Sequence, residues 1–341
     1  MARVSQLAAS AAVEAVRDSG MELERENPTR VGCVIGTAAG DYTNLEEQHL
    51  RFEKRGPGSV NPLSVPRIIP NMPACNAAIV LGIHGPNMGV AAACATGASA
   101  IGAGLGLLRQ GRVDVVLAGG AESTITPLVI DAYGCMGVLS GRNDEPERAS
   151  RPFDADRDGF VIGEGAGVLV LETAGHARQR GATPLAVLRG SGETCDAYNV
   201  VLPAPDGKWA AAAMLLALQD AGVDPDEVGY VNAHGTSTKV NDRVETLAIR
   251  SVFGDRRVAV SSTKSMIGHT LGAAGAIEAA ATVLAVHHGV LPPTINYETP
   301  DPECDLDVVA NEARDEHVGV AISNAFGFGG QNAVLVFGRA G

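Results

Sequence analysis

The pattern of hydrophobic and polar positions alternates between helical stripes and short apolar runs along the chain. Apolar residues recur every three or four positions over residues 3–19, which predicts an amphipathic helix. Residues 31–37 form a short apolar run typical of a buried strand, and residues 41–52 can form a second helix. Residues 55–75 are rich in Pro, Gly and Asn and predict a long loop. This alternation favours an α/β protein.

The later elements continue the alternation. The small apolar residues that lead to Cys94 predict a buried strand, followed by an Ala/Gly-rich helix over 95–108. Further strands are expected over 113–120, 167–172, 185–191, 228–234, 258–262, 318–323 and 333–337. Further helices are expected over 174–180, 210–221, 242–253 and 273–288, and the polar stretch 140–159 is expected to be rich in turns.

The order of these elements is similar in the two halves of the chain, which indicates a duplicated α/β unit. We therefore expect an N-terminal half over residues 1–180 and a C-terminal half over residues 181–341. The second half opens with the strand at 185–191, whereas the first opens directly with a helix. By this comparison the first half lacks its opening strand.

Composition narrows the class of protein. Aromatic residues make up only 4% of the 341 residues and there are 42 glycines, so small side chains do most of the packing. The formal net charge of -13 argues against nucleic acid or an anionic membrane as the main partner. The six cysteines show neither a disulfide framework nor a zinc spacing, which indicates a reducing, cytoplasmic setting. We expect no membrane-spanning run and no signal peptide.

Cys94 is the first candidate nucleophile. It lies where the small-residue run meets the start of the predicted helix at 95–108. Unpaired N–H groups and the positive end of the helix dipole stabilise a thiolate at such a position. Taken alone, the stretch is equally consistent with a small cysteine buried in the core.

Three further stretches place polar groups in apolar surroundings, at 232–238, 261–269 and 324–330. Groups at the carboxyl ends of strands line the sites of α/β sheets, so we expect Cys94, His234 and the Lys264/His269 pair to converge. A thiolate with imidazole donors suits acyl-thioester chemistry. Each stretch also has a structural interpretation, as a packed histidine, a solvated lysine or a glycine turn. No metal or dinucleotide site is expected, because ligand spacings and a GxGxxG motif are missing.

Four motifs in this order carry a resemblance to a known family. They are Ala-Cys-Ala-Thr-Gly at 93–97, Asn-Ala-His-Gly-Thr-Ser-Thr at 232–238, Ser-Thr-Lys-Ser-Met-Ile-Gly-His at 262–269 and Phe-Gly-Phe-Gly-Gly at 326–330. The chain resembles the β-ketoacyl-acyl-carrier-protein synthases of the long-chain elongating type (synthase II), including Arg-Asp-Gly-Phe at 157–160. The resemblance implies a thiolase-like α/β fold of duplicated βαβαβ halves in a layered α-β-α-β-α arrangement.

The resemblance also implies a role for each motif residue. Cys94 would carry the acyl chain, and His234 and His269 would bind the malonyl thioester and promote its decarboxylation. The backbone N–H groups of Cys94 and Phe328 would form the oxyanion hole, and Phe328 would gate the acyl and malonyl pockets. Lys264 would complete the catalytic set in an electrostatic role, paired with Glu278. Glu278 and Phe326 would support the site, and Thr236 and Thr238 would bind the phosphopantetheine arm.

The implied activity is an acyltransferase reaction of fatty acid biosynthesis, a decarboxylative condensation that gives 3-oxoacyl-carrier protein and CO2. The implied partners are acyl- and malonyl-loaded acyl carrier protein and a second copy of the chain, with no dissociable cofactor. Two alternatives remain: a type II polyketide ketosynthase, and a non-catalytic chain-length-factor-like partner. If the histidines act as neutral donors, the rate should fall below about pH 6.5.

Overall fold

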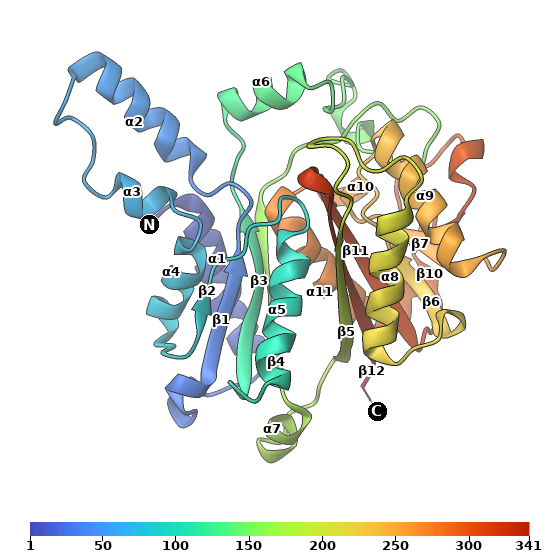
Figure 1. The fold of residues 1–341 in the computed structure, drawn as a ribbon, viewed down its shortest axis with the longest axis horizontal. Helices are drawn as coiled ribbons and strands as arrows, with labels where there is room; N and C mark the ends of the chain where they lie inside the picture. The colour runs from blue at the N-terminus through green and yellow to red at the C-terminus, as the bar shows by residue number, and fades with distance from the viewer. Residues whose placement is uncertain (341) are drawn as a thin grey trace. The chain divides into compact units, whose positions relative to one another are not determined.

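The computed structural model describes residues 1–340, which form two compact units (Figure 1). The first unit comprises Met1–Ala132, Glu164–Ala182 and Thr270–Ala276. The second unit comprises Tyr133–Gly163, Thr183–His269 and residues from 277 onward. Each unit is built on its own β-sheet. The division of the chain at residue 180 stays a prediction.

The first unit contains a four-stranded sheet in the order β2-β1-β3-β4. Its strands are β1 (Val31–Gly36), β2 (Asn87–Met88), β3 (Val115–Glu122) and β4 (Gly165–Glu172), with β4 antiparallel to β3 and the others parallel. Its helices are α1 (Arg3–Asp18), α2 (Tyr42–Arg55), α3 (Ser64–Ile68), α4 (Met72–Leu81), α5 (Thr96–Arg109) and α7 (Ala174–Gln179). The apolar stripe of α1 packs with α4, β1 and β3 in one core cluster.

The second unit contains a six-stranded sheet in the order β5-β12-β11-β6-β7-β9. Its strands are β5 (Ala186–Cys195), β6 (Val228–Asn232), β7 (Ala259–Ser261), β9 (Asp307–Val308), β11 (Val320–Gly327) and β12 (Gln331–Arg339). β8 (Val290–Leu291) and β10 (Arg314–Asp315) pair separately. α8 (Lys208–Ala221), α9 (Lys239–Phe253) and α10 (Lys264–Ile267) complete it, and α8 packs on β5 and β12 (Figure 1).

Two helices fall in both units, α6 (Pro127–Cys135) and α11 (Ala274–His288). Within residues 1–340, short 3₁₀ turns connect the elements: η1 (Leu23–Arg25), η2 (Pro28–Arg30), η3 (Pro146–Arg148), η4 (Pro225–Glu227), η5 (Leu271–Ala273), η6 (Pro302–Cys304) and η7 (Phe328–Gly330). By length and composition alone, the stretch Leu271–His288 could cross a membrane. It is 67% buried inside the protein, as a core helix of a soluble protein would be.

The duplication predicted from sequence is visible in the two sheets. β6, β11 and β12 correspond to β1, β3 and β4, because each set has two parallel strands followed by an antiparallel one. β12 is covered on its other side by β5, whereas β4 is the edge of its sheet. Among residues 1–340 the first unit therefore has no counterpart of β5, as the comparison of the halves predicted.

Two expectations about the first unit were wrong. Residues 55–75 contain α3 and the start of α4. The proline that indicated a loop stands in the first turn of α4, where its missing N–H costs nothing. The run before Cys94 is not a continuous strand, because only Asn87–Met88 pairs with β1 and Ala93 then turns into the left-handed region at φ 47°.

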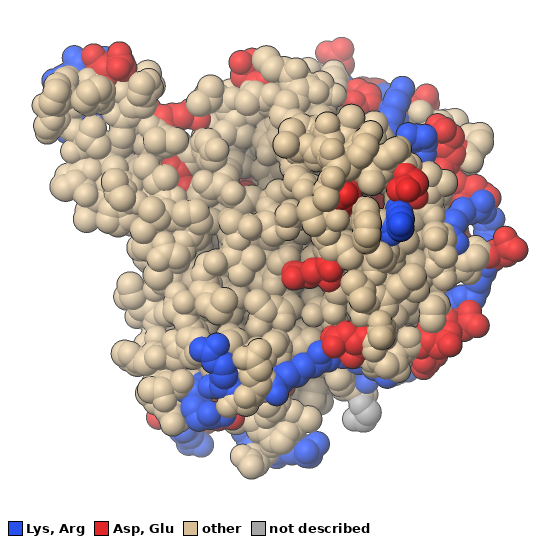
Figure 2. Space-filling view, in the orientation of Figure 1, with Lys and Arg blue, Asp and Glu red and all other residues tan. Residues whose placement is uncertain are grey.

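The outer surface of α3, α4 and β2 is strongly apolar. Exposed fractions are 63% for Leu63, 69% for Val65 and 75% for Ile79, and Met88 on the edge strand is also exposed. Figure 2 shows almost no charged side chains over α3 and α4 on the face drawn. Contiguous exposed apolar surface of this kind marks an interaction site.

Candidate active site

Cys94 lies in a sharp turn at the start of α5 in the first unit. The residue before it, Ala93, has φ 47°, a conformation that non-glycine residues rarely adopt. The hydroxyl of Thr96 fixes the turn, accepting from the N–H of Ala92 at 2.8 Å and donating to the carbonyl of Ala93 at 2.7 Å. Cys94 itself is 8% exposed. The chain thus holds the cysteine in a strained, hydrogen-bonded turn in place of the predicted strand. Its position at a helix N-terminus agrees with the expectation from sequence.

Glycines let the backbone close tightly around this turn. A Cβ on Gly36 at the end of β1 would lie 2.3 Å from the methyl carbon of Thr96. A Cβ on Gly97 would lie 2.5 Å from the backbone nitrogen of Ala276. Neither distance is tolerable for real atoms, so the position of the turn depends on both glycines.

A buried carboxylate, Glu122, joins three segments of the first unit. It accepts hydrogen bonds from the Thr37 hydroxyl at 2.9 Å, the Ala38 N–H at 2.9 Å and the Gly272 N–H at 3.2 Å. Burial raises the pKa of Glu122 to about 7. Sequence reasoning missed this residue, although a lone carboxylate at the end of an apolar strand is a signal that could have found it.

The second unit brings His234 and His269 together. His234 follows the end of β6 and His269 follows α10, and both are nearly fully buried. Their ring centroids lie 5.3 Å apart with the planes at 83°. The backbone of His269 is held on both sides, donating to the carbonyl of Val161 at 2.7 Å and accepting from the N–H of Gly163 at 2.9 Å. Two imidazoles of fixed orientation therefore share one small buried region.

Glu245 fixes the turn that presents His234. Its two carboxylate oxygens accept from the backbone N–H groups of His234 and Gly235, each at 2.8 Å, and one also accepts from the Asn324 amide at 3.1 Å. Burial raises the pKa of Glu245 to about 7. Sequence reasoning missed this residue too. Its position one turn after Asp242, on the buried side of α9, could have indicated it.

Lys264 provides the positive charge of this region. It is 1% exposed, forms the expected ion pair with Glu278, and donates to the backbone carbonyl of His234 at 2.6 Å. Burial, and then the Lys264 charge, lower the pKa of His234 and of His269 well below 6.5. Both imidazoles are therefore neutral at physiological pH. The expected fall in rate near pH 6.5 needs correction, because protonation requires a more acidic solution.

The remaining predicted residues, which are Phe326, Phe328, Thr236 and Thr238, also belong to the second unit. The rings of Phe326 and His234 are 5.8 Å apart. Phe328 opens η7, where Gly329 and Gly330 are both left-handed, and its ring is 6.4 Å from Tyr133. The hydroxyls of Thr236 and Thr238 are 2.9 Å apart, and that of Thr238 also caps α9.

The structure thus groups the histidines, Lys264, Glu278 and Phe326 in the second unit, while Cys94 belongs to the first. The convergence of Cys94 with the histidines stays a prediction. Within residues 1–340 no group of three His, Cys, Asp or Glu side chains is arranged to hold a metal ion.

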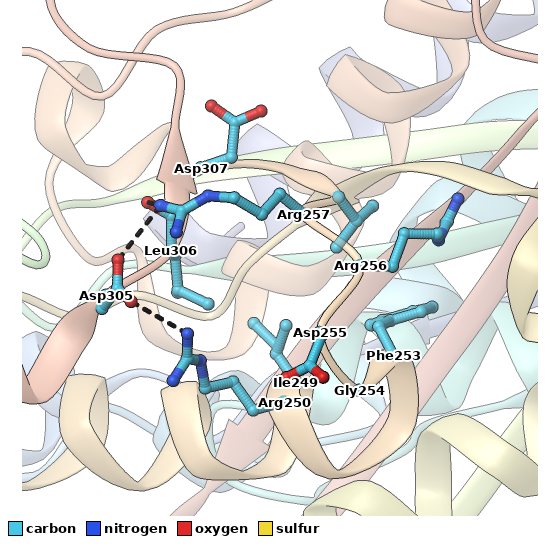
Figure 3. Close-up of a pocket in the computed structure, with 11 residues that line it drawn as sticks. Ile249, Arg250, Phe253, Gly254, Asp255, Arg256, Arg257, Asp305, Leu306 and Asp307 are labelled. Carbon is cyan, nitrogen blue, oxygen red and sulfur yellow. Dashed lines mark hydrogen bonds and ion pairs between the residues drawn. The ribbon is translucent and has the colours of Figure 1, made fainter.

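A surface hollow of about 420 Å³, measured with its solvent-open space, lies at the end of α9 (Figure 3). Asp305 lies between Arg250 and Arg257 there and accepts from them at 2.9 and 3.0 Å. Arg256 points away from Asp305 and donates to backbone carbonyls, including that of Asp226 at 3.1 Å. Each of these arginines therefore has a hydrogen-bond acceptor within the protein. None of the predicted site residues lines the hollow.

Residues 1–177 match the beta-ketoacyl synthase N-terminal domain, and residues 185–298 match the beta-ketoacyl synthase C-terminal domain. The chain belongs to the β-ketoacyl synthase family. This β-ketoacyl synthase is 46% identical over 339 residues to the 3-oxoacyl-[acyl-carrier-protein] synthase 2 of Synechocystis sp., covering 99% of this chain and 82% of that protein. It is 45% identical to the same enzyme of Staphylococcus aureus, of which 84% is covered.

Solved structures place this β-ketoacyl synthase among thiolase-like α/β folds. One is a type II polyketide synthase (PKS) ketosynthase in complex with its acyl-carrier protein and bound to a hexaketide. It has a TM-score of 0.97 and 36% identity, covering 99% of this chain and 85% of that one. A β-ketoacyl synthase from Burkholderia phymatum STM815 has a TM-score of 0.94 and 37% identity, covering 100% and 83%. The expected fold class is therefore confirmed.

Proposed function

We propose that the protein catalyses the decarboxylative condensation of an acyl-enzyme thioester with malonyl-acyl-carrier protein, giving 3-oxoacyl-acyl-carrier protein and CO2. The observation that carries the proposal is the pair of buried His234 and His269 imidazoles beside Lys264. Neutral imidazoles donate hydrogen bonds to a thioester carbonyl and stabilise the enolate that forms when CO2 leaves. The relatives named 3-oxoacyl-[acyl-carrier-protein] synthase 2 support the same reaction.

The proposed reaction has two stages. In the first, Cys94 Sγ attacks the thioester carbon of acyl-carrier protein, and the carrier leaves as its free thiol with the cysteine proton. In the second, the C–C bond to the malonyl carboxylate breaks and the resulting enolate carbon attacks the acyl-Cys94 carbonyl. Backbone N–H groups of Cys94 and Phe328 hold the tetrahedral oxyanion. Collapse of that intermediate expels the Cys94 thiolate and releases 3-oxoacyl-carrier protein.

The carrier protein brings the phosphopantetheine arm, so the enzyme needs no dissociable cofactor of its own. We assign Thr236 and Thr238 to that arm, because their adjacent hydroxyls offer a donor and acceptor pair to its amides. The solved ketosynthase in complex with an acyl-carrier protein supports a carrier partner of this kind.

Fatty acid elongation is favoured over polyketide assembly. The chain is 46% identical to a 3-oxoacyl-[acyl-carrier-protein] synthase 2, against 36% to the PKS ketosynthase. The retained Cys94 argues against a non-catalytic chain-length-factor-like partner. Incubation with malonyl-carrier protein and saturated acyl primers should give 3-oxoacyl products extended by one two-carbon unit. Products extended repeatedly without reduction would instead support polyketide assembly.

Intact-mass measurement tests the residue roles. Acyl-carrier protein should add one acyl group to the wild-type chain and none to Cys94→Ala. Cys135→Ala, which removes an exposed cysteine, is the matched control and should acylate normally. His234→Ala and His269→Ala should still acylate but should stop releasing CO2 from malonyl-carrier protein. Normal CO2 release by both histidine variants would contradict the proposal.

The working enzyme is proposed to be a cytoplasmic homodimer. The apolar surface of α3 and α4 beside the edge strand β2 supports self-association, because an exposed strand edge and apolar side chains favour pairing with a second copy. None of the cysteines in the described chain forms a disulfide, which supports a reducing compartment. Light scattering after gel filtration should give twice the chain mass, and Ile79→Glu should shift it to the monomer.

A further inference from the structure

The segment Arg151–Gly159 has no role in the proposed reaction, although its Arg-Asp-Gly sequence belongs to the family resemblance. The structure places this segment against the turn that carries Thr236 and Thr238. Both belong to the second unit.

The turn is held in a strained backbone conformation. Gly235 has φ 36° and Ser237 has φ 68°. A serine in the left-handed region costs free energy and persists only where the surrounding structure imposes it. The strained conformation brings together the hydroxyls of the residues on either side of Ser237, Thr236 and Thr238, which lie 2.9 Å apart.

Three contacts from the segment impose this conformation. The N–H of Arg151 donates to the Ser237 hydroxyl at 2.9 Å, and the N–H of Gly159 donates to the Ser237 carbonyl at 3.0 Å. The side chain of Arg157 binds the next two backbone carbonyls: its Nε donates to the carbonyl of Thr238 and its Nη2 to the carbonyl of Lys239, both at 3.2 Å. Of the three contacts, that of Arg157 is the one in which the segment uses a side chain, so substitution of a segment residue can remove it without changing the turn itself.

The guanidinium group of Arg157 is itself held by acidic and carbonyl groups outside the turn. It is 2% exposed, and its Nη1 donates to the carboxylate of Asp301 at 2.5 Å and to the carbonyl of Asp154 at 2.8 Å. Asp242 lies 3.5 Å from its Nε. Only a planar guanidinium offers several donors in one rigid fork, so a lysine could satisfy the charges here but not the adjacent carbonyls.

We propose that Arg157 is a positioning residue, which holds the Gly235–Thr238 turn in the form that binds the phosphopantetheine arm. This inference rests on the proposed function. It assigns Arg157 to recognition of carrier-bound substrate and not to the chemistry at Cys94 or the histidines. Loss of the guanidinium hydrogen bonds to the turn should therefore raise KM for malonyl-carrier protein and leave kcat nearly unchanged.

The decisive variant is Arg157→Lys, which keeps the buried positive charge beside Asp242 and Asp301. Losing two hydrogen bonds from a charged donor should raise KM about tenfold and change kcat by less than about twofold. Arg151→Lys is the matched control. Arg151 is equally buried, but its side chain donates to Asp154, Asn296 and Glu298 instead of the turn. The control should lose similar thermal stability and keep the wild-type KM.

A double-variant cycle separates positioning from general loosening. Where Thr236→Val and Thr238→Val have already removed the hydroxyls, Arg157→Lys should raise KM by less than about twofold. Equal tenfold effects in both backgrounds, or an equal rise in KM from Arg151→Lys, would overturn the inference. Alkylation of Cys94 by iodoacetamide should proceed at the wild-type rate throughout. A wild-type chain that fails to condense at all would instead contradict the proposed function.

Discussion

The ammonium group of Lys264 lies 2.6 Å from the backbone carbonyl oxygen of His234 and pairs at the same time with Glu278. A buried cation is thereby attached to the residue whose protonation it opposes. Its charge, added to burial, lowers the pKa of both His234 and His269. We propose that the lysine acts through the imidazoles, without contact with substrate.

Removing the charge pair should change the pH dependence of decarboxylation. Lys264→Met alone leaves Glu278 buried without a cation, which costs about 3–5 kcal/mol. The double variant Lys264→Met/Glu278→Gln avoids that cost and should fold. Without the cation the histidine pKa values rise, so the acid limb of kcat should move to higher pH. Decarboxylation of malonyl-carrier protein measured between about pH 4 and pH 8 checks this. An unmoved limb would show that burial alone sets the protonation state.

The Thr96 hydroxyl should be needed for the reactivity of Cys94, because it holds the turn that precedes the cysteine. Thr96→Val removes the hydroxyl that bonds both Ala92 and Ala93, so the strained turn loses two hydrogen bonds. We expect a loss of about 1–3 kcal/mol in the free energy of unfolding and a slower acylation of Cys94. Thr96→Ser keeps the hydroxyl and should retain most of the acylation rate. Urea unfolding and intact-mass time courses measure the two effects.

The sequence was most informative where periodicity and motif agreed. The stripe over residues 3–19 became α1, and the run over 31–37 became β1. His234 and Lys264 could be placed at strand ends because the apolar runs before them are unambiguous. Their mutual contact could not be derived, since it depends on a side chain reaching a backbone carbonyl thirty residues away.

The errors have physical causes. The prolines and glycines of residues 55–75 indicated a loop, but tertiary packing of Ala74 and Ala77 against α1 stabilises α4. Glu245 and Glu122 were missed because most glutamate side chains are exposed to solvent, so a glutamate in the sequence gives no sign of burial. The backbone N–H groups that donate to these two carboxylates are brought to them only by the fold.

Stability should fall in mild acid because of the two histidines. Their pKa is lower in the folded chain than the 6.5 of the unfolded chain, so the unfolded state binds more protons below that value. The stabilisation is complete above pH 6.5 and is lost as the pH falls toward the folded pKa values. His234→Gln should reduce the slope of unfolding free energy against pH, below about pH 6, by about 1.4 kcal/mol per unit. Urea titrations at several pH values measure it, and an unchanged slope would mean that His234 titrates normally.

Two of the glycines of α5, Gly97 and Gly106, should respond in opposite ways to the same substitution. A Cβ on Gly97 would lie 2.5 Å from the backbone nitrogen of Ala276, whereas a Cβ on Gly106 would meet nothing within 4 Å. Gly106→Ala should therefore stabilise the protein by about 0.5–1 kcal/mol, because alanine loses less entropy in a helix. Gly97→Ala must displace α5 from Ala276, and Cys94 lies three residues before that contact. We expect a lower melting temperature and slow acylation from Gly97→Ala, while Gly106→Ala acylates normally. Thermal melts and intact-mass acylation of the pair test this, and equal behaviour would show that the close approach to Ala276 is not needed.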